Sequence, residues 1–394
     1  MERIGIYGGS FNPPHIGHIE AAKQAVARLQ LDRLLMVPAG VVPHKVLPAN
    51  SPTALQRLQM LRIATADCPN LEVSDVELCR EGVSYTWQTV QALRQHYPDA
   101  KLILIMGTDM FLSFHTWKNP AQIIQNASLG VFYRGQRDEV AAVEKQKLFL
   151  EKQGAKVYLV DNPVTEISST DLRRLLNFRC ADEFLDPAVT DFIRQNRLYG
   201  TDRALIGLSL EELEKTVVSL LKPNRVAHVL GCRDTAVELA RRWGADENDA
   251  ARAALLHDIT KALDGPLQLT LCHAYGIILD HFAAHNPKTL HALTGSYVAQ
   301  RIFGENAAVV SAIASHTTGK ANMNVLEKII YVADYMEPNR DFPGVDELRD
   351  LARTDLDKAL KTGLEMTLAM LRQQGKEISP ESLEALAWLE TSNI

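Results

Sequence analysis

The chain has 394 residues, of which 46% are hydrophobic and 23% are charged, and its formal net charge is −6. This length exceeds one ordinary hydrophobic core and predicts two or three domains. The negative charge argues against the broad basic surface that nonspecific nucleic-acid binding needs. Five cysteines lie far apart without a C-x-x-C pair, which indicates reduced thiols. With no signal peptide and no apolar run of about 18 residues, the sequence predicts a cytoplasmic protein without nucleic-acid or membrane partners.

The first 200 residues alternate short apolar runs with amphipathic stretches. Six runs predict strands, at Arg3–Tyr7, Arg33–Val37, Leu71–Asp75, Lys101–Met106, Leu129–Tyr133 and Lys156–Val160. In the stretch "HIEAAKQAVARLQ", Ile19, Ala22, Val26 and Leu29 fall on one helical face. The alternation predicts an α/β fold with a mostly parallel sheet, which binds ligands beyond the carboxyl ends of its strands.

A turn rich in glycine and proline, "GGSFNPPHIGH", follows the first predicted strand. Gly8 and Gly9 permit a tight turn and the close approach of a ligand to backbone N–H groups. A helix is expected to begin near His15, and His18 lies one turn further on the same face. Both imidazoles therefore point to the helix N-terminus, which favours anions. Two donors there suit a phosphate that gains negative charge in a transition state.

A second motif, "EISSTDLRRLL", follows the last predicted strand at residues 166–176. Hydroxyl groups at a helix start cap N–H groups or bind phosphate, and Arg173 can hold phosphate oxygens. The alternative is an ordinary helix cap with an exposed arginine.

Further candidates lie in three other segments. Asp109 and Trp117 follow the predicted strand Lys101–Met106, where a carboxylate can meet a ribose or amide and an indole can stack on a pyridine ring. The alternative for Trp117 is a half-buried packing aromatic. Thr86 in "SYTW" and Lys45 in "VPHK" are weaker candidates, and Lys45 would be a mobile cation that seeks phosphate.

The strings "GGSFNPPHIGH", "VPHK", "SYTWQTV", "MGTDMFLSFHTW" and "ISSTDLRRLL" together resemble the bacterial nicotinate-nucleotide adenylyltransferases, a branch of the H-x-G-H nucleotidyltransferases. The resemblance covers residues 1 to about 200 and implies a Rossmann-like domain. That family joins ATP to nicotinate mononucleotide and releases pyrophosphate, with Mg²⁺ neutralising the triphosphate. Transfer to another acceptor, such as phosphopantetheine or nicotinamide mononucleotide, stays open.

The resemblance also implies roles for individual residues. His15 and His18 would be catalytic and stabilise the α-phosphate. The remaining residues would bind substrate: Gly8, Gly9, Ser10 and the backbone N–H of Phe11 from the turn, Ser169, Thr170 and Arg173 at the triphosphate, and Lys45, Thr86, Asp109 and Trp117 elsewhere.

From about Ser209 onward the periodicity is helical throughout. Ser209 and Glu212 form a capping-box signal for a new helix. We therefore expect a boundary between Tyr199 and Ser209, with domains at 1–200 and 208–394, the second of them all-α.

Seven of the twelve histidines lie in this second half. Six histidine and aspartate side chains follow small or apolar residues or, for the pair at 257 and 258, end an apolar stretch: His228, His257, Asp258, His291, His316 and Asp334. Buried ionisable groups are costly unless they are paired or bound to metal. Mixed nitrogen and oxygen ligation from separate helices would suit one or two divalent metals such as iron, manganese or zinc. Taken singly, each histidine has the alternative of a satisfied core residue, and His273, His281 and His285 are placed in that class.

The ordered series of these residues resembles the HD-domain metal-dependent phosphohydrolases. The longer strings "LLHDITK", "LHALTG", "SHTTG" and "EKIIYVADYMEPNRDFPG" are similar to one branch, the symmetrical diadenosine-tetraphosphate hydrolases with a di-iron centre, over residues 210–394. This implies that the six residues bind two divalent metals, expected to be iron, and that Asp258 bridges them and is catalytic. Lys261, Thr317 and Arg340 would contact phosphates, or else be solvated or capping residues.

The whole chain is thus expected to be a bifunctional enzyme whose partners are ATP, nicotinate mononucleotide and diadenosine tetraphosphate. Hydrolysis of another nucleotide, such as guanosine tetraphosphate, and a regulatory HD module without hydrolysis stay open, as does a homo-oligomer.

Overall fold

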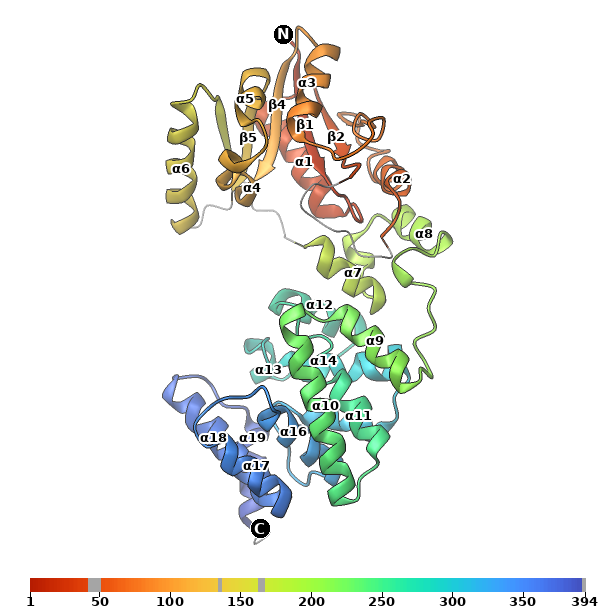
Figure 1. Cartoon of the computed structure of the whole chain (residues 1–394), viewed down its shortest axis with the longest axis vertical. Coiled ribbons are helices and arrows are strands. Elements are labelled where there is room, and N and C mark those ends of the chain that lie inside the picture. The colour runs from red at the N-terminus through yellow and green to blue at the C-terminus, as the bar shows by residue number, and fades with distance from the viewer. Residues whose placement is uncertain (42–50, 134–136, 162–166, 392–394) are drawn as a thin grey trace. The chain divides into compact units, whose positions relative to one another are not determined.

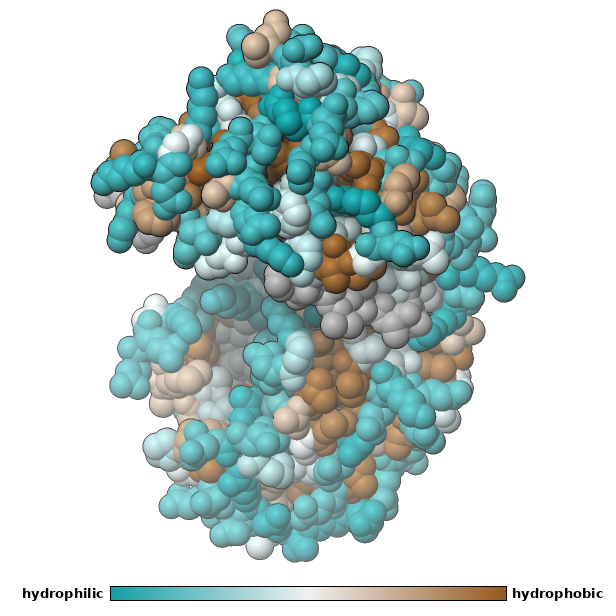
Figure 2. Space-filling view, turned by 45° about the horizontal axis from the view of Figure 1, so that its top comes forward, coloured by the Kyte–Doolittle hydropathy of each residue, from teal (hydrophilic) through white to brown (hydrophobic). Residues whose placement is uncertain are grey.

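The computed structural model describes residues 1–41, 51–133, 137–161 and 167–391. The chain forms two compact units, Met1–Asp202 and Arg203–Ile394 (Figure 1). Hydrophilic residues cover most of the face seen in Figure 2, and hydrophobic ones form smaller patches. Within the described ranges, no helix is both long and apolar enough to cross a membrane.

The first unit is built on a six-stranded sheet in which all neighbouring strands are parallel. The strands are β1 (Arg3–Gly9), β2 (Arg33–Pro38), β3 (Leu71–Val73), β4 (Lys101–Gly107), β5 (Ser128–Tyr133) and β6 (Val157–Asp161). Their order, β3-β2-β1-β4-β5-β6, is that of a doubly wound sheet. The predicted α/β fold is confirmed.

Helices cover both faces of this sheet. Side chains of α1 (Ile16–Leu29) and α2 (Ala54–Ala64) join one buried cluster. Those of α3 (Thr86–His96), α4 (Thr108–Leu112), α5 (Pro120–Asn126) and α6 (Arg137–Glu151) belong to the other. Two further helices, α7 (Ser169–Asn177) and α8 (Pro187–Gln195), complete the unit. The strand order reverses between β1 and β4, and such a switch point is where doubly wound sheets bind ligands.

The second unit contains only helices among its described residues. In chain order they are α9 (Leu210–Leu220), α10 (Pro223–Trp243), α11 (Glu247–Leu256), α12 (Gly265–Tyr275), α13 (His281–His285), α14 (Leu290–Val298), a π-helical turn (Ala299–Phe303), α15 (Ala307–Ser315), α16 (Val325–Met336), α17 (Val345–Thr354), α18 (Leu356–Gln373) and α19 (Pro380–Thr391). The predicted capping box is present, since Ser209 and Glu212 hydrogen-bond each other at the start of α9.

The core of the second unit is formed by α10, α11, α14, α15 and α16, which pack against one another. Alanine-rich faces allow close packing, and six alanine and leucine side chains of α11 are at most 1% exposed, namely Ala250, Ala251, Ala253, Ala254, Leu255 and Leu256. Each of these five helices carries or directly precedes one of the expected metal-binding residues.

Candidate functional sites

The first candidate site lies where β1 ends. The ring of Phe11 is fully buried beneath the turn, and Phe11 has a left-handed backbone with φ of 44°. A Cβ atom at Gly9 would lie 3.1 Å from that ring, which is tighter than ordinary contacts, so glycine leaves the room that Phe11 needs. Gly8 is exposed with open space around it. The backbone of this turn is therefore open to a ligand on one side and packed on the other.

The two histidines lie together at the start of α1, as the spacing predicted. His15 is the N-cap residue, and its ring centroid is 3.7 Å from that of His18. The backbone N–H of His15 donates to Nδ1 of His18 over 3.3 Å. Since Nδ1 accepts this bond, a neutral His18 carries its proton on Nε2. Among the described residues, Nδ1 of His15 is buried without a hydrogen-bond partner.

Burial keeps both imidazoles neutral. It lowers the pKa of His15 to about 4. It also lowers the pKa of His18 well below the usual value, and the neighbouring His15 adds to this effect. At neutral pH the pair therefore offers N–H donors without positive charge.

A pH dependence of stability follows from the burial of His15. Its pKa of about 4 in the folded chain lies below the ordinary 6.5, so the unfolded state binds more protons between these values. Stability should therefore fall as the pH falls from 6.5 to 4, with a His15 contribution on the order of 3 kcal/mol. Calorimetric unfolding between pH 7 and 4.5 would measure it. A His15→Gln variant should show a shallower pH dependence, and an unchanged slope would contradict the prediction.

Two arginines support the turn, of which Arg57 is buried and Arg173 is half-buried. Arg57 of α2 is 1% exposed and donates to the carbonyl oxygen of Ser10 at 2.7 Å and that of Ala39 at 2.6 Å. Arg173 of α7 donates to the carbonyl oxygen of Asn12 at 2.8 Å and to Oγ1 of Thr170 at 3.0 Å. Burial lowers the pKa of both guanidinium groups. These contacts place two cations directly behind the turn.

The start of α7 differs in detail from the expectation. Ser168 is the N-cap residue, and its Oγ accepts from the N–H of Asp171. Ser169 is the first helical residue, and Thr170 is exposed. The structure thus brings Thr170 and Arg173 to the Gly- and Pro-rich turn, with Arg173 as the link.

The other predicted residues of this unit lie around the ends of β4 and α3. Asp109 is exposed in α4, directly after β4, and Thr86 begins α3. Trp117 is half-buried, and its ring centroid lies 5.2 Å from that of Phe114. Part of its ring surface is therefore used in packing, which was the alternative interpretation of this residue. Lys45 lies outside the described residues.

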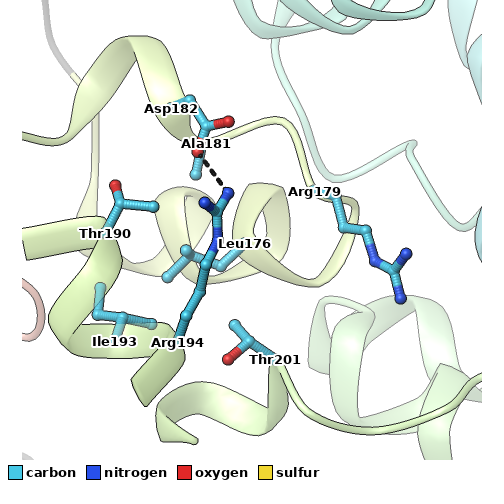
Figure 3. Close-up of a pocket in the computed structure, with 8 residues that line it drawn as sticks. All are labelled: Leu176, Arg179, Ala181, Asp182, Thr190, Ile193, Arg194 and Thr201. Carbon is cyan, nitrogen blue, oxygen red and sulfur yellow. Dashed lines mark hydrogen bonds and ion pairs between the residues drawn. The ribbon is translucent and has the colours of Figure 1, made fainter. Parts of the chain in front are cut away.

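A pocket of about 300 Å³ lies elsewhere in this unit, between α7, α8 and the segment that follows α8 (Figure 3). Its lining includes Arg194, which is paired with Asp182 at 3.2 Å, and the buried Thr190. None of the predicted site residues lines it. We therefore place the candidate nucleotide site at the turn and not at this pocket.

The second candidate site gathers all six predicted histidines and aspartates at the centre of the helical unit. Asp258, which is 1% exposed, has its two oxygens turned to different histidine pairs. Its Oδ2 lies 3.7 Å from Nε2 of His228 and 3.6 Å from that of His257. Its Oδ1 lies 3.4 Å from Nε2 of His291 and 3.8 Å from that of His316. This is the arrangement of a carboxylate that can bridge two metal ions.

The distances within each pair fit a shared ion. Nε2 of His228 and of His257 are 3.3 Å apart, and Oδ1 of Asp334 is 3.1 Å from Nε2 of His228. On the other side, Nε2 of His291 and of His316 are 3.2 Å apart. Metal–ligand bonds of about 2.0–2.2 Å place neighbouring ligands about 3.0–3.4 Å apart. The donor set therefore fits two divalent metals, with Asp258 between them.

Hydrogen bonds orient the imidazoles for this purpose. The Nδ1 atoms of His257, His291 and His316 lie 2.7–2.9 Å from the carbonyl oxygens three residues earlier in the chain. Donation from Nδ1 to a carbonyl leaves the lone pair of Nε2 available for a metal.

The charges of the site match metal binding at neutral pH. Burial lowers the pKa of His316 to about 4 and, together with the charge of Lys261, lowers that of His291 well below the usual range. Burial opposes ionisation of Asp258 and Asp334, but the neighbouring His257 and a hydrogen bond with His228 respectively hold their pKa values low. Metal ligands must be neutral imidazoles and ionised carboxylates, and the pKa shifts of His291, His316, Asp258 and Asp334 all lie in that direction.

Polar and cationic side chains surround this cluster. The Lys261 ammonium lies 2.8 Å from Nε2 of His291, and Thr317 Oγ1 lies 3.2 Å from the same atom. Arg340 contacts Asp334 at 2.7 Å. Arg225, which we did not predict, forms an ion pair with Asp258. Its position three residues before His228, and so on the same helix face, was the signal in the sequence.

Three histidines lie apart from the cluster. His273, His281 and His285 are exposed, so the expectation of core positions is wrong for all three. The buried residues of α12 lie on the face opposite His273, and the short α13 buries no residue at all.

Comparisons with known proteins agree with both sites. A cytidylyltransferase-like family model matches residues 6–175, and an HD-domain model matches residues 225–339. Over 202 residues the chain is 35% identical to a probable nicotinate-nucleotide adenylyltransferase of Neisseria meningitidis, which covers 50% of this chain and 99% of the relative. Over 183 residues it is 39% identical to a symmetrical bis(5′-nucleosyl)-tetraphosphatase of Bacillus subtilis, which covers 46% of this chain and 98% of the relative.

A solved structure from Clostridium acetobutylicum, described as an HD superfamily hydrolase involved in NAD metabolism, is 38% identical. The match covers 47% of this chain and 98% of that chain, with a TM-score of 0.46.

The folds and the two sites define an enzyme with a nucleotidyltransferase domain followed by a metal-binding HD hydrolase domain. The chain belongs to the nicotinate-nucleotide adenylyltransferase family through its first half and to the HD-domain symmetrical tetraphosphatase family through its second. Both resemblances predicted from the motifs are confirmed.

Proposed function

We propose that this chain is a bifunctional nucleotide enzyme. Residues 1–200 transfer the adenylyl group of ATP to nicotinate mononucleotide, and residues 208–394 hydrolyse diadenosine tetraphosphate to two ADP. The observation that carries the first activity is the neutral histidine pair beside the open turn at the sheet's switch point. The observation that carries the second is Asp258, with one oxygen toward each histidine pair.

Adenylyl transfer at the first site needs no covalent enzyme intermediate. A phosphate oxygen of the mononucleotide attacks the α-phosphorus of ATP in line, and the bond to the pyrophosphate oxygen breaks. His18 Nε2–H and His15 donate to the α-phosphate oxygens as their negative charge grows. Gly8, Gly9, Ser10 and the N–H of Phe11 hold phosphate at the turn.

The remaining residues of this domain would bind the two substrates. Thr170 and Arg173, joined to the turn by hydrogen bonds, hold the triphosphate together with Ser169, while Mg²⁺ arrives with ATP. Thr86 at the start of α3, Asp109 directly after β4 and Trp117 beyond α4 contact the acceptor. Nicotinamide mononucleotide and phosphopantetheine are the alternative acceptors to test beside nicotinate mononucleotide.

At the second site, His228, His257, His291, His316, Asp258 and Asp334 would hold two divalent metals, and iron is our expectation. When bound, the metals supply Lewis acidity toward phosphate and an acidified water. Lys261, Arg225 and Arg340 are three cations at the edge of the cluster, and with Thr317 they can hold the polyphosphate. A substrate with four phosphates needs such a set of donors, whereas a regulatory module without hydrolysis would not need it.

Metal removal separates the two activities. We expect the chain, stripped of metal by a chelator and then given Mg²⁺ alone, to form nicotinate adenine dinucleotide and pyrophosphate from ATP and nicotinate mononucleotide. It should not release ADP from diadenosine tetraphosphate until Fe²⁺ or Mn²⁺ is added, because the histidine-rich cluster prefers transition metals. Both products are measured by chromatography.

Parallel reactions with nicotinamide mononucleotide and phosphopantetheine identify the acceptor, and guanosine tetraphosphate serves as the alternative substrate for hydrolysis. Undiminished release of ADP by the metal-free chain would contradict the metal-dependent reaction.

A further inference from the structure

The four histidines of the metal cluster differ in the group that contacts Nδ1, the ring nitrogen that is not directed to the other ligands. Nδ1 of His257, His291 and His316 contacts a backbone carbonyl three residues earlier, at or near a helix end. His228 lies inside α10, where backbone carbonyls are used by the helix itself. Its Nδ1 instead lies 3.1 Å from Oε1 of Glu337, a residue 109 positions away. Only this ligand depends on a distant carboxylate.

Glu337 is held firmly in that position. It is 1% exposed, and its Oε2 accepts from the backbone N–H of Asn339 at 2.7 Å and from the Asn339 side chain at 2.8 Å. The helix that carries His228 is shaped to admit it. A Cβ atom at Gly231 would lie 2.4 Å from Oε2 of Glu337, so no other residue fits there unless the carboxylate moves. Glycine weakens a helix interior, and here it leaves space for the carboxylate.

The two halves of the cluster also differ in their ligands. The half around His228 has His257, Asp334 and one oxygen of Asp258, with Glu337 behind it. The half around His291 has His316 and the other oxygen of Asp258, with the Lys261 ammonium close by. Arg225 and Arg340 lie near the first half, where each faces a carboxylate. The first half thus has one more anionic ligand and one more outer anion than the second.

We propose that Glu337 is a positioning residue that fixes His228 with its proton on Nδ1 and thereby makes the His228 half the tighter of two unequal metal sites. The inference rests on the proposed two-metal centre. A carboxylate behind a histidine raises its basicity and fixes its orientation, and loss of such a partner typically lowers metal affinity about 10- to 100-fold.

The Glu337→Gln variant tests this sharply. Asn339 offers two donors to Oε2 of Glu337. In the variant, the amide oxygen of glutamine would therefore take the place of Oε2, and its NH₂ group would face His228. His228 would then have to accept at Nδ1 and carry its proton on Nε2, which closes the metal-binding nitrogen. We expect titration of the metal-free full chain with Zn²⁺, against a competing chromophoric chelator, to show about a 10- to 100-fold loss at the tighter site. The weaker site should keep its affinity.

The matched control is Glu305→Gln, another buried carboxylate of this domain, which pairs with Arg252 away from the cluster. It should leave both Zn²⁺ affinities unchanged. If the wild type binds two Zn²⁺ and Glu337→Gln binds both with the wild-type affinities, the inference is overturned but the metal centre is not. If the wild type binds no Zn²⁺, the metal centre itself is overturned. Histidine ¹⁵N NMR of the wild type gives a test without any variant, since a proton on Nε2 of His228 would also overturn it.

Discussion

Replacing Asp258 with asparagine should abolish hydrolysis of diadenosine tetraphosphate and leave adenylyl transfer unchanged. Both oxygens of this carboxylate face histidine pairs, at 3.4–3.8 Å. Asparagine therefore leaves an NH₂ group in place of one of these oxygens and removes the negative charge that both metal positions share. Loss of an outer hydrogen-bond partner of a metal ligand costs roughly 10- to 100-fold, and the loss of a shared ligand should cost more. The measurements are ADP release and bound metal per chain.

The chain contains its own control for this experiment. Adenylyl transfer by the first domain reports whether the purified variant is intact, because its site lies in the other compact unit. Asp234→Asn is the matched variant, since Asp234 is on α10 with His228 but pairs with Arg233. It should keep hydrolysis near the wild-type rate. Hydrolysis by Asp258→Asn within tenfold of wild type would contradict a bridging role.

The elements of the fold could be predicted from sequence where local pattern decides them. The six strands were located to within two residues at most of their ends, because each is a short apolar run between polar turns. The order of the strands could not be predicted, since it depends on which crossover returns to which edge. The end of β3 was predicted too late, at Asp75. The pairing with β2 stops at Val73, and the polar residues Ser74 and Asp75 follow it.

The same division holds for the sites. Histidines and aspartates in distinctive strings could be assigned from sequence, and the structure places the six in the helical domain together. Arg57 and Glu337 were missed because their partners are 47 and 109 positions away. A weak signal existed for Arg57, which shares the buried face of α2 with Met60 and Leu61. A charged residue on an apolar helix face needs a partner, but the sequence does not say which one.

Replacing His18 should have the largest effect on adenylyl transfer. The Nε2–H group of His18 is the donor that we place on the α-phosphate, and it interacts most strongly as charge develops there. Removing one such donor costs roughly 100- to 1,000-fold in kcat. For His18→Ala we expect that loss with a similar fall in kcat/KM and little change in KM for ATP, as for a contact made only in the transition state.

Two amides separate the chemical role of His18 from its structural one. In His18→Asn, an amide oxygen near the place of Nδ1 can still accept from the N–H of His15, so the start of α1 keeps its hydrogen bond but the donor toward phosphate is lost. In His18→Gln, the longer amide restores a donor near the place of Nε2. If the donor matters, glutamine should retain clearly more kcat than asparagine or alanine. If asparagine performs as well as histidine, the residue serves only to begin the helix, because the backbone hydrogen bond is the one feature those two side chains share.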